Sequence, residues 1–129
     1  MPTPSAALKW LAIVAILGTG LIHVLEARDA FADATYKGLL FVGNGVGALA
    51  AAIGIARGQR VLGWDLGLLV AGGAMCAYVA SRTIGLPGLP AEPDAWLEPM
   101  GVASLSCELL FVIGFVLASK SRPATGHPR

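Results

Sequence analysis

The chain has 129 residues, of which 56% are hydrophobic and 13% are charged, and its mean hydropathy is +0.73. Soluble domains carry roughly 25% charged residues, so this composition excludes an ordinary soluble domain and is typical of a membrane protein. The net charge is only +1, so the chain lacks the basic excess that is typical of nucleic-acid-binding proteins. The sequence also contains no run of basic residues that would bind anionic lipid. Cys76 and Cys107 lie in apolar runs, which predicts reduced, buried thiols and no disulfide framework.

Four apolar segments follow one another along the chain, and each has the roughly 20 residues that a membrane-spanning helix needs. The sequence therefore predicts an all-α, integral membrane four-helix bundle that forms a single domain over residues 1–129. The expected spans are about 6–26, 38–56, 61–84 and 101–119, and residues 120–129 are expected to form a disordered tail.

The first segment has an alternative as a secretory signal peptide, with Lys9 in its basic region. The residues before Arg28, "LEA", match a small-x-small cleavage site poorly. This mismatch favours a retained span.

Basic residues are distributed unequally between the two ends of the predicted bundle. Six of the nine lie at the ends of the chain and in the turn "RGQR": Lys9, Arg57, Arg60, Lys120, Arg122 and Arg129. The opposite side carries three bases and six acids: Arg28, Lys37, Arg82, Glu26, Asp29, Asp33, Glu92, Asp94 and Glu98. The positive-inside rule then predicts a bacterial inner-membrane protein with both termini in the cytoplasm.

Two connections are expected on the outer side. Residues 27–37 either lie at the membrane interface or extend the first helix. Residues 85–101 contain four prolines and three glycines, so they cannot be regular helix throughout. Trp96 in this stretch is expected to anchor at the lipid headgroups.

Small residues recur every four positions on the second and third segments. The stripes are Gly43, Gly47 and Ala51 on one, and Gly63, Gly67 and Ala71 on the other. Such stripes let helix backbones approach closely in lipid. Because the turn between the segments is short, the sequence predicts an antiparallel hairpin in which the stripes face each other.

Glu108 is the most costly residue in the spans, because a charge at mid-helix costs about 2.5–3.5 kcal/mol on insertion scales. Six polar side chains are expected to converge in the outer half of the bundle: His23, Glu26, Asn44, Tyr78, Arg82 and Glu108. Within this set, His23, Arg82 and Glu108 are predicted to form one cluster with Glu26 at its mouth. The cluster either ties helices together or carries a proton or a small ligand.

His23 and Glu26 lie one helical turn apart and can supply two metal ligands, whereas zinc needs three or four. Outside the tail the chain has no second histidine, so a helix-end hydrogen bond competes with metal binding, and haem would need a dimer. The metal and the cofactor stay unassigned. Asp65 is interpreted as a flanking charge near Arg57 or Arg60. The chain has no GxSxG or phosphate-binding loop, so no enzyme activity is expected.

The stretch from Tyr78, "YVASRTIGLPGLPAEPDAWLEPMGVASLSCELLFV", together with "LIHVLEARDAF", resembles a group of small four-span bacterial membrane proteins. These share a "SRTxGLPG" stretch before the last span and an acid within that span. The resemblance implies the topology and no particular activity. It marks six positions as shared: His23, Arg82, Thr83, Gly85, Pro87 and Glu108.

Two functions remain as hypotheses. The first is an accessory or structural subunit of a larger membrane complex or of a homo-oligomer, in contact with lipid and with other membrane proteins. The alternative is an outward-facing protein that binds or transports a small ligand, a metal or a proton through the polar cluster.

Overall fold

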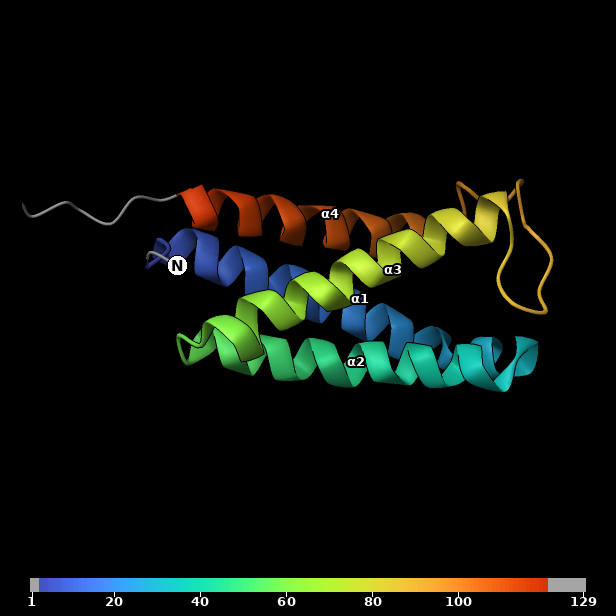
Figure 1. The fold of residues 1–129 in the computed structure, drawn as a ribbon, viewed down its shortest axis with the longest axis horizontal. Coiled ribbons are helices and arrows are strands. Elements are labelled where there is room, and N and C mark those ends of the chain that lie inside the picture. Colours follow the sequence, from blue (N-terminus) through green and yellow to red (C-terminus); the bar gives the residue numbers. More distant parts are fainter. Residues whose placement is uncertain (1–2, 121–129) are drawn as a thin grey trace, which may run out of the picture.

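The computed structural model describes residues 3–120, which form an antiparallel bundle of long helices (Figure 1). The long helices are α1 (Ala6–Asp33), α2 (Thr35–Ala56), α3 (Leu66–Thr83) and α4 (Pro99–Lys120). A short π-helix, η1 (Arg60–Asp65), leads directly into α3. Apart from one isolated bridge between Leu86 and Leu89, residues 3–120 contain no β-structure. The predicted all-α class is confirmed. The disordered tail was predicted to begin at residue 120, but Lys120 is the last residue of α4, and residues 121–129 lie outside the described residues.

Four helical stretches are long and apolar enough to cross a membrane, with α3 counted together with η1. The outer surface of the bundle is apolar on every helix, and large exposed side chains include Val14, Leu40, Leu69 and Leu109. A soluble protein rarely exposes apolar surface on this scale. The four helices and this apolar surface suggest a multi-pass membrane protein.

The connection between α1 and α2 is shorter than the sequence indicated. Of the two alternatives for residues 27–37, the structure shows the helix extension, since α1 continues to Asp33 and α2 begins at Thr35. Only Ala34 between them is extended, with φ −165° and ψ 143°. An ion pair of 2.6 Å between Asp33 and Lys37 spans this junction.

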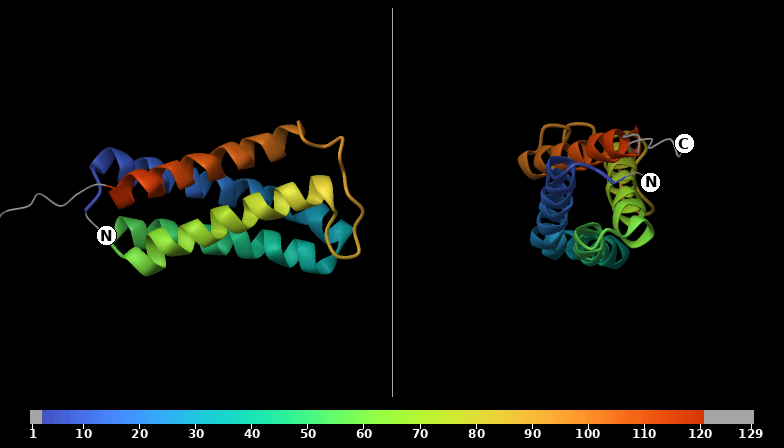
Figure 2. Two further views of the ribbon diagram at one scale, coloured as in Figure 1. Left: turned by 45° about the horizontal axis from the view of Figure 1, so that its top comes forward. Right: turned by 90° about the vertical axis from the view of Figure 1, so that its left-hand side faces the viewer.

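Helix α3 crosses the bundle obliquely and changes partner along its length (Figures 1 and 2). Where the chain enters α3, Gly63 lies against the backbone of α2, and a Cβ atom added there would lie 2.6 Å from the nitrogen of Ile55. At its other end α3 lies against α4, because Tyr78 packs on Gly101. The part of α2 near Thr35 therefore has little of α3 beside it.

This crossing limits the predicted glycine packing to part of the two stripes, because Gly63 packs on α2 as expected but other stripe residues do not reach the partner helix. Gly67 faces Phe111 on α4 and not α2, and Gly43 has no atom within 4 Å of an added Cβ. Gly47 contacts α3 at Val70, with 2.9 Å to its Cγ2. The two stripes therefore do not face each other along their whole length, because α3 has turned away from α2 by the level of Gly43.

The closest approach along α1 and α2 was not predicted. A Cβ added at Gly20 would lie 2.5 Å from Cβ of Ala48, and Val24 covers Gly45. Small residues at this crossing bring the two helices together as the predicted stripes were expected to do.

The buried core lies mainly toward the end of the bundle where α1 begins and α4 ends. Its largest side chains are Ile16, Ile55, Trp64 and Phe111, with alanines between them. The expectation that both cysteines are buried is wrong, because Cys76 is exposed on the outer surface and Cys107 is half-buried. Both are free thiols.

Candidate functional site

A group of polar side chains lies between α1 and α4, deep within both helices. We call Thr19, His23, Ser104 and Glu108 the mid-bundle cluster. At 1.5 Å per residue, Glu108 lies about 14 Å along a helix of about 33 Å, close to its middle. Glu108 is 1% exposed, Thr19 is 0% exposed and Ser104 is 6% exposed. Lipid hydrocarbon offers these groups no hydrogen bonds, so they must find partners within the bundle.

Two hydroxyl groups donate to one oxygen of Glu108. Thr19 Oγ1 donates to Glu108 Oε2 at 2.6 Å, which joins α1 to α4. Ser104 Oγ donates to the same oxygen at 2.5 Å from one turn away on α4. The two hydroxyl oxygens are themselves 3.0 Å apart. A hydrogen bond contributes about 0.5–1.5 kcal/mol to stability; the bond from Thr19 ties α1 to α4, whereas the bond from Ser104 lies within α4.

His23 completes the cluster from the next turn of α1. Its Nδ1 lies 2.8 Å from the carbonyl oxygen of Thr19, 3.3 Å from Thr19 Oγ1 and 3.5 Å from Ser104 Oγ. A carbonyl oxygen can only accept, so Nδ1 carries the hydrogen in this arrangement. In a neutral imidazole Nε2 is then the unprotonated nitrogen. The ring is partly exposed and lies 4.9 Å from the ring of Phe41 on α2.

Arg82 does not belong to this cluster, which corrects the prediction. Its Nε and Nη2 donate to the carbonyl oxygen of Ala95 at 3.3 and 3.2 Å, and its Nη1 donates to Ser81 Oγ at 2.7 Å. Its guanidinium carbon lies 3.9 Å from the centroid of the Tyr78 ring. Arg82 is thus occupied by the loop of residues 84–98, which folds back over the end of α3.

Tyr78 and Trp96 lie in the same outer group. The Tyr78 hydroxyl donates to the carbonyl oxygen of Trp96 at 2.5 Å, and the two rings meet edge-on with centroids 5.8 Å apart. Glu98 accepts from the backbone nitrogens of Met100 and Gly101, at 3.1 and 2.7 Å, and so caps α4. We call Tyr78, Arg82, Trp96 and Glu98, with the loop backbone that they bind, the loop clamp.

The "SRTxGLPG" stretch has a structural explanation in this loop. Gly85 has φ +84°, and an added Cβ would lie 2.7 Å from the carbonyl oxygen of Leu89. The carbonyl oxygen of Pro87 accepts from the Tyr36 hydroxyl at 2.6 Å, which ties the loop to α2. Thr83 Oγ1 donates to its own helix at Val79. These residues shape and fasten the loop.

Glu26 and Asn44 form no side-chain hydrogen bond with either group among residues 3–120. Glu26 is partly buried and interacts electrostatically with Glu98 and His23, but within residues 3–120 it forms no ion pair with Arg82. The side-chain oxygen of Asn44 is buried and has no hydrogen-bond partner among the described residues. The expected set of six polar residues therefore splits into two sites and two single residues.

Asp65 was expected near Arg57 or Arg60. Its Oδ2 lies 3.9 Å from Arg60 Nε, and both side chains are largely exposed. An exposed pair at this distance contributes little to stability. This contact agrees with the interpretation of Asp65 as a flanking charge.

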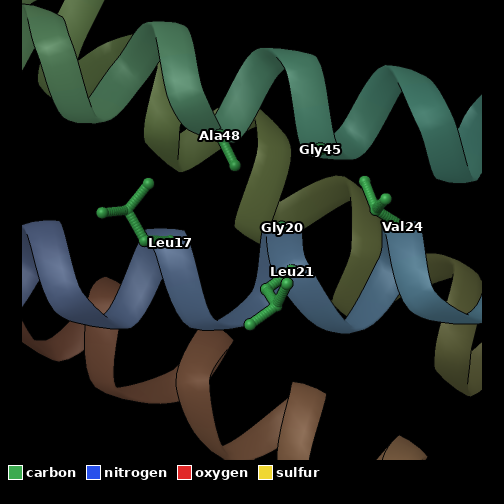
Figure 3. A pocket seen from close by; sticks show the side chains of 6 residues that line it. All are labelled: Leu17, Gly20, Leu21, Val24, Gly45 and Ala48. Atoms are coloured by element: carbon green, nitrogen blue, oxygen red, sulfur yellow. The ribbon is translucent and has the colours of Figure 1, made fainter.

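Within residues 3–120, no three His, Cys, Asp or Glu side chains lie close enough together to hold a metal ion. An open groove of about 230 Å³ runs between α1 and α2 (Figure 3). It is lined from α1 by Leu17, Gly20, Leu21 and Val24, and from α2 by Gly45 and Ala48. This apolar groove contains no member of the mid-bundle cluster.

Comparison of the chain with protein-family models, with curated proteins and with solved structures gives no match. The functional argument therefore depends on the geometry alone. The residue that sequence reasoning missed is Thr19. The signal was its position four residues before His23, which places both side chains on one face of a helix.

Proposed function

We propose that this chain is a small bacterial inner-membrane protein that acts as an accessory or structural subunit of a membrane complex or of a homo-oligomer. The proposed orientation places both termini in the cytoplasm. Lys9, Arg57, Arg60 and Lys120 support it, because they lie at the end of the bundle where α1 begins and α4 ends. The proposal assigns no catalytic activity.

The observation that carries the subunit role is an uncovered glycine surface on α2 and α3. Cβ atoms added at Gly43 and Gly73 would meet no atom within 4 Å, and both residues are exposed on the outside. A glycine within a helix lowers the stability of the helix by about 1 kcal/mol relative to alanine. At Gly43 and Gly73 no close helix contact within this chain offsets that loss. In lipid, small residues on a helix surface allow a second helix backbone to approach closely.

The mid-bundle cluster supports the same role in a different way. Glu108 joins α1 to α4 through Thr19, and the loop clamp joins α3 to the start of α4. Polar groups in the spans are therefore used largely inside the bundle, and the outer surface presents apolar side chains and glycine to its surroundings. Such a surface suits contact with lipid and with partner helices.

The alternative role, outward-facing binding or transport, has one observation in its favour. Glu108 has no ion-pair partner among residues 3–120, although it is an acidic side chain buried near the middle of a span. The subunit role is preferred because, among residues 3–120, Glu108 accepts hydrogen bonds from two hydroxyl groups, and the one from Thr19 holds α1 and α4 together.

The subunit role is tested by purification from native membranes after mild crosslinking. Gly43→Leu and Gly73→Leu enter open space and should fold as the parent does, yet lose partner proteins or self-association. Val14→Leu is the matched control, because Val14 is 67% exposed on α1, away from the glycine surface. Mass spectrometry separates foreign subunits from a second copy. An unchanged set of co-purifying proteins in both glycine variants contradicts the proposal.

A further inference from the structure

The mid-bundle cluster contains a titratable group at each end and a hydroxyl group between them. Thr19 Oγ1 lies 2.6 Å from Glu108 Oε2 and 3.3 Å from His23 Nδ1. Glu108 and Thr19 are almost completely buried, whereas His23 is partly exposed. The line from His23 to Glu108 therefore runs from a partly exposed side chain to the middle of α4.

We propose that His23 and Glu108 form one proton-binding unit in which the Thr19 hydroxyl relays a proton between Nδ1 and Oε2. The proton enters at Nε2 of His23, the ring nitrogen that makes no hydrogen bond among the described residues. This inference goes beyond the proposed subunit role, and its failure would leave that role intact.

The relay step conserves atoms and charge. Before transfer, His23 carries hydrogen on both ring nitrogens and Glu108 is a carboxylate. The Nδ1–H bond breaks as a new O–H bond forms on Thr19, and the original Thr19 O–H bond breaks as the Glu108 O–H bond forms. After transfer, His23 is neutral with hydrogen on Nε2, Glu108 is a neutral acid, and the hydrogen bonds through Thr19 point the opposite way.

The geometry gives each state its own hydrogen-bond partners. With Nδ1 protonated, the ring donates to the Thr19 carbonyl oxygen at 2.8 Å. With Nδ1 unprotonated, the carbonyl oxygen of Thr19 can no longer accept from it, so the ring must turn slightly toward the Thr19 hydroxyl, which donates to Nδ1 while the neutral acid of Glu108 donates to Thr19 Oγ1. Neutralising Glu108 also removes a charge from the bundle interior, where an isolated charge is costly.

The neighbouring titratable groups come from every element packed around the cluster. The titratable neighbour on α4 is Cys107, which interacts electrostatically with Glu108. The titratable neighbour on α1 is Glu26, which interacts electrostatically with His23. On α2, Lys37 lies over the Phe41 ring that faces His23. Tyr78 and Arg82 of α3, with Glu98, surround Gly101 two turns from Glu108. Two hydroxyl groups bridge His23 and Glu108. Ser104 Oγ lies 3.5 Å from His23 Nδ1, and Thr19 Oγ1 is closer to it at 3.3 Å, so Thr19 is the proposed relay.

The chain has only two histidines, His23 and His127, which makes the test direct. Protein labelled with ¹⁵N in its imidazole rings and carrying His127→Ala is reconstituted in lipid and titrated. Nitrogen NMR reports which ring nitrogen of His23 carries hydrogen, and infrared spectroscopy reports the C=O band of a protonated carboxyl group. Glu108→Gln identifies the part of that band that belongs to Glu108.

We expect the Glu108 acid band and the Nε2–H form of neutral His23 to appear together over the same pH range in the parent protein. Thr19→Val keeps the side-chain shape without the hydroxyl group and should lose this joint appearance, while Thr19→Ser should retain it. In Glu108→Gln, neutral His23 should carry hydrogen on Nδ1 throughout.

Thr19→Val and Glu108→Gln must first elute and melt as folded protein. If Thr19→Val does not fold, the comparison of parent with Glu108→Gln decides alone. The proposal is overturned if the two signals change over separate pH ranges in the parent, if Glu108 shows no acid band at any pH, or if folded Thr19→Val titrates as the parent does.

Discussion

Gly67 and Gly73 lie two turns apart on α3, and the same substitution at each should change stability in opposite directions. A Cβ atom at Gly67 would overlap the ring of Phe111, reaching 2.9 Å from Cε2. Phe111 is 0% exposed and packs against Trp64, with ring centroids 6.1 Å apart, so it has little room to move. At Gly73 an added Cβ would meet no atom within 4 Å.

The two contributions can be weighed against each other. Replacing glycine by alanine within a helix gains about 1 kcal/mol from helix propensity. Overpacking a filled core costs about 1–3 kcal/mol. Gly73→Ala should therefore stabilise the bundle by up to about 1 kcal/mol, whereas Gly67→Ala should destabilise it by up to about 2 kcal/mol. Gly67→Leu should be worse than Gly67→Ala, because the larger side chain has no space at all.

Reversible unfolding in mixed detergent micelles, followed by far-ultraviolet circular dichroism, measures these free energies. Phe111→Leu replaces the ring by a smaller side chain, so it should restore part of the stability that Gly67→Ala loses. A double-mutant cycle gives the coupling energy between the two positions. Equal effects of Gly67→Ala and Gly73→Ala, or a coupling energy of zero, would refute the assignment of Gly67 to the α4 interface.

Three further predictions concern the outer loop. Arg82→Lys should lower stability by about 0.5–1 kcal/mol, because lysine cannot reproduce the planar contact with the Tyr78 ring; thermal melting in detergent measures it. Tyr36→Phe should cost about 0.5–1.5 kcal/mol through one lost hydrogen bond, and should speed proteolysis of the loop before α4. Gly85→Ala should be more destabilising than Gly58→Ala: both glycines have positive φ, but only Gly85 lacks room for a Cβ. Equal melting temperatures for the two alanine variants would contradict the last prediction.

The four helices could be predicted from sequence because hydropathy and length depend only on local composition. The same patterns said nothing about which helix lies beside which. Gly43 and Gly67 were assigned to one interface because their spacing matches, yet α3 crosses from α2 to α4 between those levels. Crossing angles depend on the side chains of all the neighbouring helices, which a periodicity within one segment does not contain.

For the polar residues, too, burial could be predicted from the neighbouring sequence, whereas their partners from other parts of the chain could not. Glu108 and His23 could be selected as buried or half-buried because ionisable groups in apolar segments are rare. The partner of Arg82 could not be selected, because the path of a proline-rich loop decides which carbonyl oxygen reaches it. Thr19 gave only a weak signal, since a threonine in a membrane helix can bond its own backbone as well as a neighbouring helix.

The separation of the two polar sites has a consequence for how each can act. The loop clamp binds backbone carbonyl oxygens at Ala95 and Trp96, so breaking its bonds releases the loop. The link between Thr19 and Glu108 joins side chains alone, so its hydrogen bonds can reverse direction without any change in the helices. A protonation change at Glu108 would then leave the bundle assembled. A fixed outer clamp and a reversible inner link are therefore compatible with one protein that is both a stable subunit and a proton-binding one.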